Sequence, residues 1–171
     1  PMADGIAVEG IRLVFENLPK AFANGKDLVA RAHMMSAAAM GAAAFQKGLG
    51  AIHSLSHPIG ALYDTHHGMT NAVFMPYVLV FNRPAIEDKI GRLAAWLGLE
   101  GGFLSFLHWV LDLRARLGVP PTLAALGVPG DRLDELAAMA LDDPTAGGNP
   151  VPLFLADMRR LYERSFDGTG L

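Results

Sequence analysis

Apolar residues recur at helical spacing along nearly the whole chain, and this periodicity favours a helical fold above any other. Two of the apolar stripes stop at Leu97 and Leu117, and each is followed by a glycine that suits a helix end. Pro19 is expected to interrupt or end the first helix. No segment shows the alternation of a half-buried strand. We therefore predict an all-α fold of about seven or eight helices, some of them kinked by proline.

Several segments carry predictions about individual helices. The helix expected over residues 27–46 contains MMSAAAMGAAAF, whose small side chains let neighbouring backbones approach closely, so it is predicted to be a central buried helix. Pro84 suits the first position of a helix, so a helix over residues 70–81 is predicted to be followed by a separate one that begins at Pro84. Residues 121–126 suit a further short helix, and the loop DDPTAGGNP is predicted to be irregular.

Composition excludes several classes of function. The chain has 171 residues, which is enough for one domain with its own core. The net charge of -3 gives no overall attraction for nucleic acid or anionic lipid, and the longest apolar run is short for a membrane span, so neither is predicted as a partner. The lack of cysteine rules out disulfides and thiolate metal sites, and it fits a cytoplasmic protein.

The chain is rich in apolar residues for a soluble domain. Hydrophobic residues make up 51% of the sequence and charged residues only 18%. A surface of this composition is expected to pack in part against something else. The partner would be either a missing domain or a second copy of the chain in a homodimer.

Four of the six histidines fall between His53 and His67, in a segment that is otherwise mostly apolar. His53 and His57 are four residues apart, so on a helix their rings would share one face. His67 comes after a predicted turn at YDTHHGMTN, and a second helix beyond the turn could fold its ring back toward His53. Two or three neutral imidazoles in an apolar wall would suit a divalent metal such as Fe²⁺ or Zn²⁺.

Structural roles for the same residues remain open on spacing alone. A buried histidine such as His53 is more often a hydrogen-bonded core residue than a ligand. His66 and His67 could be turn residues that cap a helix. Asp64 could orient an imidazole or could bond to the backbone of its own turn. A zinc peptidase is not predicted, because Ser54 stands where the HExxH motif has glutamate.

The segment GLGAIHSLSHPIGALYDTHHGMTNAVFMPYVLVFN resembles the signature of the iron-containing (group III) alcohol dehydrogenases. The shared pattern is G-x-x-H-x-x-x-H-x-x-G, then His-Gly, then Asn-Ala and an apolar run that ends in proline. PMADGIAVEGIRLVFENLPKAF resembles the helix that follows the family's first metal-binding helix, and GGNPVPL resembles its Gly-Asn-Pro loop before the last helix. The resemblance therefore covers nearly the whole chain and implies the family's C-terminal helical domain.

The resemblance also implies a site. Family members hold a divalent metal, usually iron and sometimes zinc, between this domain and a nucleotide-binding α/β domain. An Asp and a His from one helix and two further His bind the metal. Carried over by position, the two further ligands are His53 and His67, and His57 is the non-ligating catalytic and cofactor-binding histidine near the nicotinamide and substrate. His66 falls at a position that the family does not fix. The metal polarises the alcohol so that hydride can pass to NAD or NADP.

The first ligand helix and a nucleotide-binding motif are not found in the sequence. Residues 1–171 are therefore expected to form a single helical metal and substrate domain, with the N-terminal nucleotide-binding domain absent from this chain. The implied function is oxidation of an alcohol to an aldehyde or ketone, with the isolated chain inactive. The alternative is a non-catalytic helical interaction module derived from that fold. A stand-alone metal hydrolase built on the same histidines would lack an evident general base.

Overall fold

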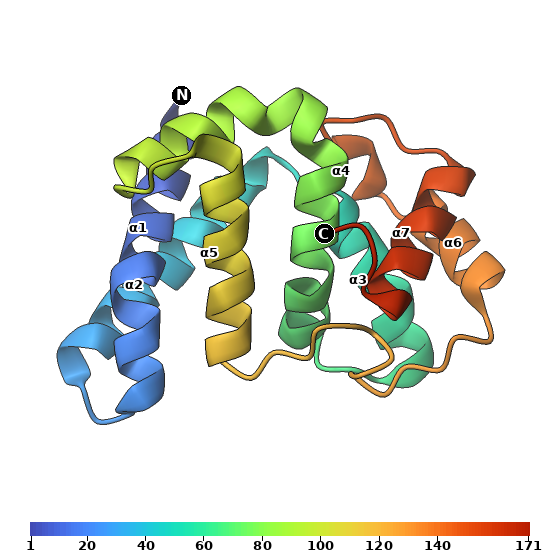
Figure 1. Ribbon diagram of the computed structural model, residues 1–171, viewed down its shortest axis with the longest axis horizontal. Helices are drawn as coiled ribbons and strands as arrows, with labels where there is room; N and C mark the ends of the chain where they lie inside the picture. The colour runs from blue at the N-terminus through green and yellow to red at the C-terminus, as the bar shows by residue number, and fades with distance from the viewer.

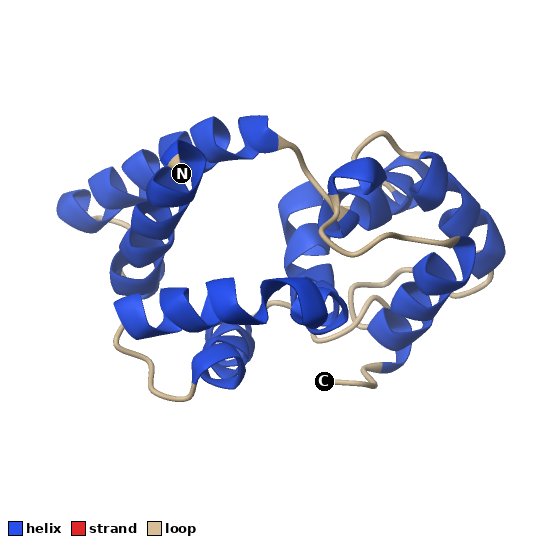
Figure 2. Ribbon diagram, turned by 90° about the horizontal axis from the view of Figure 1, so that it is seen from above, coloured by secondary structure: helices blue, strands red, loops and turns tan.

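A computed structural model describes all of residues 1–171, and it contains helices and no strands (Figures 1 and 2). The elements are α1 (Met2–Ala23), α2 (Leu28–Ala44), the 3₁₀ turn η1 (Phe45–Lys47), α3 (Ala51–Tyr63), α4 (His67–Trp96), α5 (Gly102–Arg116), α6 (Leu133–Asp142), the 3₁₀ turn η2 (Ala146–Gly148) and α7 (Leu155–Asp167). The predicted all-α class is confirmed. Residues 121–126 form turns and not the short helix that was predicted.

Two groups of helices are joined by α4. Figure 1 shows α1 and α2 at one end of the molecule, and α3, α6 and α7 around the first half of α4 at the other end. The main core lies in the second group and includes Leu55, Ile59, Phe74, Leu136 and Tyr162, none of them more than 1% exposed. A smaller core lies between the second half of α4 and α5. The histidine-bearing helix α3 therefore belongs to the larger and better packed group.

The long helix α4 corrects the prediction of a separate helix that begins at Pro84. Its 30 residues run through both Pro76 and Pro84. Figure 1 shows that α4 bends, with its first half upright beside α3 and its second half crossing toward α5. Proline removes a backbone donor and displaces a carbonyl of the preceding turn, which bends a helix without ending it when both halves are packed. Pro19 likewise lies inside α1, which continues to Ala23, so it does not end that helix.

The prediction that α2 is a central buried helix is wrong. Only Ala30 and Ala37 of this helix are buried. Its main packing partner is α1, which comes close to it at Gly10, where an added Cβ would lie 3.4 Å from the Cβ of Met40. Small side chains do allow close approach of two helices, but they do not determine how many neighbours a helix has.

Most of the apolar surface of α2 is exposed instead. Leu28 is 78% exposed and Met35 75%, and Phe22 and Phe45 lie exposed near the two ends of the helix. By length and composition alone, the segment Leu28–Lys47 could cross a membrane, with a mean hydropathy of 1.2. A core helix of a soluble protein passes the same test, so this finding is weak evidence for a membrane.

The loop before α7 is fastened to the start of α3 by Asn149. The Asn149 Oδ1 atom accepts hydrogen bonds from the Ala51 amide (3.1 Å) and from Asn82 Nδ2 (2.9 Å). Its Nδ2 donates to Asn82 Oδ1 and to the Val151 carbonyl, both at 2.7 Å. A Cβ on Gly50 would come within 3.0 Å of Asn149 Oδ1, so this approach depends on glycine. The contact holds the loop that follows α6 against the histidine-bearing helix.

We predict that Asn149→Ala lowers the free energy of unfolding by about 3 kcal/mol, because it leaves the buried Asn82 amide and the Ala51 N–H without partners. Urea unfolding followed by circular dichroism measures the change. The control is Asn24→Ala, which removes a single exposed bond to Lys26 and should cost less than about 1 kcal/mol. Equal losses in the two variants would contradict the account of the Asn149 contact.

Candidate functional site

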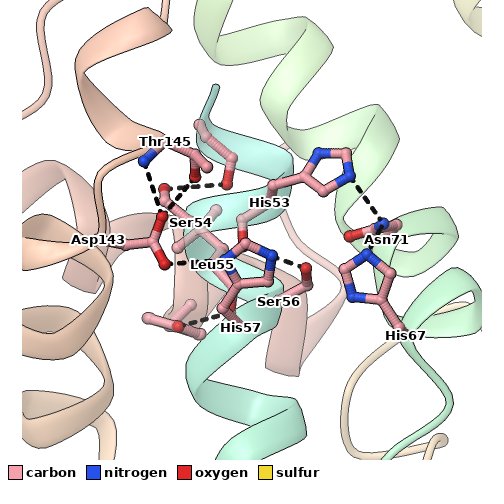
Figure 3. A network of polar contacts seen from close by, with 11 residues as sticks. His53, Ser54, Leu55, Ser56, His57, His67, Asn71, Asp143 and Thr145 are labelled. Carbon is pink, nitrogen blue, oxygen red and sulfur yellow. Dashed lines mark hydrogen bonds and ion pairs between the residues drawn. The ribbon is translucent and has the colours of Figure 1, made fainter. Parts of the chain in front are cut away.

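The helix α3 has a buried face and a face that carries histidines. Leu55 and Ile59, four residues apart, are fully buried in the main core. His53 and His57 have the same spacing and are only partly buried. Their ring centroids lie 5.9 Å apart. Because the core fixes which face of α3 is inward, both imidazoles are held on the opposite, accessible side (Figure 3).

A tight turn returns the chain to this face. Asp64 ends α3 in the left-handed conformation, with φ of 51°. His66 caps α4, since its Nδ1 accepts a hydrogen bond from the Met69 amide at 3.2 Å. The following residue, His67, is thereby directed toward α3, with its ring centroid 5.3 Å from that of His53 and 5.5 Å from that of His57. The structure thus brings His53, His57 and His67 together and gives His66 a capping role.

Asn71, which the sequence analysis did not identify, joins two of the rings. Its Nδ2 lies 3.4 Å from His53 Nε2 and 3.0 Å from His67 Nε2. An amide NH₂ group can only donate, so both Nε2 atoms act as acceptors with their lone pairs directed at one point. The Asn71 Oδ1 atom is buried without a partner. Its position four residues after His67 on a helix is the signal that could have indicated this contact.

The cluster offers a partial set of metal ligands. No group of three or more His, Asp or Glu side chains is arranged closely enough to hold a metal ion. Burial lowers the pKa of His53, and the nearby rings of His67 and His57 lower it further. These effects favour the neutral imidazole, which is the form that binds a metal.

A carboxylate reaches the third histidine from another part of the chain. The Asp143 Oδ2 atom lies 2.8 Å from His57 Nδ1. Its Oδ1 accepts from the Thr145 amide (2.8 Å) and the Thr145 hydroxyl (2.5 Å). Burial raises the pKa of Asp143, but the hydrogen bonds from Thr145 and His57 outweigh it and hold the pKa below its ordinary value. Asp143 is therefore an ionised acceptor at neutral pH.

The structure shows neither of the two roles left open for Asp64. Its backbone amide donates to the Gly60 carbonyl at 3.0 Å where α3 ends, but its carboxylate makes no hydrogen bond with the backbone of its turn and none with an imidazole. The carboxylate that bonds to an imidazole is that of Asp143, which the sequence analysis missed. The Asp-Pro-Thr sequence could have indicated its bonds with Thr145, because aspartate commonly bonds to the backbone two residues on. Nothing local indicates that its other oxygen faces His57, 86 residues away in sequence.

The helical fold is that of a known family. The chain belongs to the Fe-containing alcohol dehydrogenase family, whose C-terminal domain matches residues 1–166.

The relatives are dehydrogenases and reductases of about twice this length. The chain is 42% identical over 174 residues to the 4-hydroxybutyrate dehydrogenase of Cupriavidus necator, covering 96% of this chain and 45% of that one. It is 36% identical to the 1,3-propanediol dehydrogenase of Citrobacter freundii, again covering 45% of that protein. Its fold matches a crystal structure of 1,3-propanediol oxidoreductase with a TM-score of 0.93 and 32% identity, over 97% of this chain and 46% of that one.

Two adjacent histidines are predicted to differ in their contribution to stability. His66→Ala should lower the free energy of unfolding by about 1 kcal/mol, because α4 loses the acceptor that caps it. His67→Ala should change it by less than about 0.5 kcal/mol, because the ring is exposed and bonds only to Asn71. Chemical denaturation of both variants measures the difference, and a larger loss for His67→Ala would contradict the assigned roles.

Proposed function

We propose that residues 1–171 form a single metal- and substrate-binding domain of an NAD(P)-dependent, iron-type alcohol dehydrogenase. The reaction is oxidation of an alcohol to an aldehyde or ketone by hydride transfer, carried out with a nucleotide-binding domain. The observation that carries the proposal is the convergence of His53 Nε2 and His67 Nε2 on one point. Iron is the metal proposed because the family is described as iron-containing. Nothing in these findings favours zinc.

The residues present fit two of the ligands of a divalent ion. The Asn71 Nδ2 atom lies between the two Nε2 atoms, where it donates to both. An ion at that point would need the same two lone pairs, and imidazole nitrogens are suitable ligands for iron. The orientation of the Asn71 side chain supports this fit. Its NH₂ group bonds to both imidazoles, while its Oδ1 atom is buried without a hydrogen-bond partner. The remaining ligands are those that the resemblance places on the helix before this segment.

Each histidine of the cluster has a separate role in this proposal. His53 and His67 would hold the iron, which would supply Lewis-acid polarisation of the alcohol hydroxyl. His57 lies beside them and faces the nicotinamide and substrate, as the resemblance implies. Its ring is stacked against that of His67, with an interplanar angle of 17°. His66, which caps α4, takes no part.

The exposed apolar face of α2 supports the proposal that residues 1–171 act together with another domain or subunit. Leu28, Val29 and Met35 are each at least 68% exposed. An apolar surface of this kind is typical of a face that packs against another domain or subunit. The chain spans less than half the length of the relatives it matches. We therefore propose two partners, which are the nucleotide-binding domain and a second subunit in a homodimer. The proposed location is the cytoplasm.

The isolated chain is expected to bind Fe²⁺ weakly, and at the histidine cluster first. We predict that Fe²⁺ added anaerobically to the chain broadens the ring NMR signals of His53, His57 and His67 before those of His33 and His108. His53→Ala and His67→Ala should each lower the affinity by about tenfold or more, because each removes one of only two ligands. His66→Ala is the matched control, since it removes an adjacent imidazole that takes part in capping only, and it should leave the affinity unchanged.

The opposite pattern would overturn the metal site. If all six histidines broaden together, or if His66→Ala weakens binding as much as His67→Ala does, the ion is held elsewhere. A chain that binds no Fe²⁺ at all at millimolar concentration would favour the non-catalytic helical module.

Catalytic turnover is not expected from the isolated chain. We predict no formation of NADH or NADPH from primary alcohols in the presence of Fe²⁺, because the nucleotide-binding domain and half of the metal ligands are supplied by other segments. Absorbance at the nicotinamide band measures the product, with a full-length 1,3-propanediol dehydrogenase as the positive control. Turnover by the pure 171-residue chain would refute this prediction.

A further inference from the structure

The carboxylate of Asp143 has one oxygen on Thr145 and the other on His57, which makes it the only acidic group that hydrogen-bonds a ring of the histidine cluster. We propose that Asp143 is a positioning residue that fixes the tautomer and the orientation of His57. It keeps the proton on His57 Nδ1 and leaves Nε2 as a bare acceptor for the hydroxyl group of an alcohol substrate. Only the identity of that hydroxyl rests on the proposed function.

The tautomer follows from the chemistry of the pair. An ionised carboxylate can only accept hydrogen bonds, so a contact of 2.8 Å between Asp143 Oδ2 and His57 Nδ1 requires the proton on Nδ1. The low pKa of Asp143 supports the ionised form. The Asp143 side chain is 14% exposed and that of His57 40%, so the bond is partly shielded from water. Because Asp143 holds the proton of the neutral ring on His57 Nδ1, His57 Nε2 carries no proton.

The other nitrogen of the ring remains free. His57 Nε2 makes no hydrogen bond within the chain, whereas the Nε2 atoms of His53 and His67 both meet Asn71. Figure 3 shows the His57 ring between Asp143 on one side and His67 on the other. Asp143 thus holds the His57 ring beside His53 and His67, but His57 makes no hydrogen bond to Asn71. A substrate hydroxyl placed next to His53 and His67 would find His57 Nε2 as a hydrogen-bond acceptor in a fixed position.

The role of Thr145 gives the proposal a sharp test. Two donors of Thr145, its amide and its hydroxyl, both point at Asp143 Oδ1. In Asp143→Asn, these donors require the amide oxygen at the Oδ1 position, so the NH₂ group must occupy the position of Oδ2. That NH₂ group would donate to His57 Nδ1, which must then accept, and the ring proton would move to Nε2. The substitution therefore reverses the tautomer while keeping the size and shape of the side chain.

The test is a long-range ¹H–¹⁵N correlation spectrum of the ¹⁵N-histidine-labelled chain without metal, recorded at about pH 8.5, where an ordinary imidazole is neutral. In the unmodified chain, His57 should show a protonated Nδ1 and an unprotonated Nε2. His33 and His108 are exposed and make no hydrogen bond, so they should show the Nε2–H form that a free imidazole prefers. The His57 signal is assigned by its loss in His57→Gln.

In Asp143→Asn, the His57 pattern should be reversed. In the matched control Asp142→Asn, which changes the exposed neighbouring aspartate at the end of α6, it should stay as it was. An unmodified chain whose His57 carries its proton on Nε2, or an Asp143→Asn variant that leaves the pattern unchanged, would overturn the proposal. Should that variant fail to fold, the unmodified spectrum decides alone. Because no metal is present, the result is independent of whether His53 and His67 bind iron.

Discussion

Burial of one face of α3 fixes where the groups of the candidate site point. Leu55 and Ile59 are packed inside the main core, and the Tyr162 hydroxyl donates to the Leu55 carbonyl at 2.7 Å. A helix whose inner face is held in this way cannot rotate without exposing apolar surface, at a cost of about 1.5–3 kcal/mol for each such side chain. His53 and His57 are therefore fixed on the outer face, and the turn that ends at His66 brings the next ring to them.

The rest of the site comes from distant segments that are held against α3. Asn149 attaches the loop after α6 to the first turn of α3, and the same loop carries Asp143 to His57. Asn71 approaches from α4. The placement of His57 beside His53, and of Asn71 beside His67, thus rests on the geometry of a single helix, whereas the meeting of His53 with His67 and of His57 with Asp143 depends on packing between segments. Contacts of the first kind can be read from spacing, and contacts of the second kind cannot.

The sequence predicted the helical class, because that follows from local periodicity. It also placed His53 and His57 on one helix face by their spacing, whereas the pairing of His67 with His53 was left open by spacing and rested on the resemblance to the family. It did not predict that α4 continues through Pro84, because proline leaves open whether a helix ends or bends until its neighbours are known. The exposure of α2 was missed because small residues indicate close approach and not the number of contacts. Asp143 was missed because its contact with His57, 86 residues away in sequence, is fixed by tertiary packing. Asn71 was missed although its position four residues after His67 on a helix could have indicated their contact.

The central claim is that His53 and His67 share one metal ion at the point now filled by the Asn71 amide. Crystals of the chain soaked in Fe²⁺ without oxygen, with anomalous data collected at the iron absorption edge, test it most directly. The account predicts a single strong anomalous peak between the two Nε2 atoms, within bonding distance of both, with the Asn71 amide displaced. A peak at any other histidine, or an unmoved Asn71 with no peak beside it, would contradict the account.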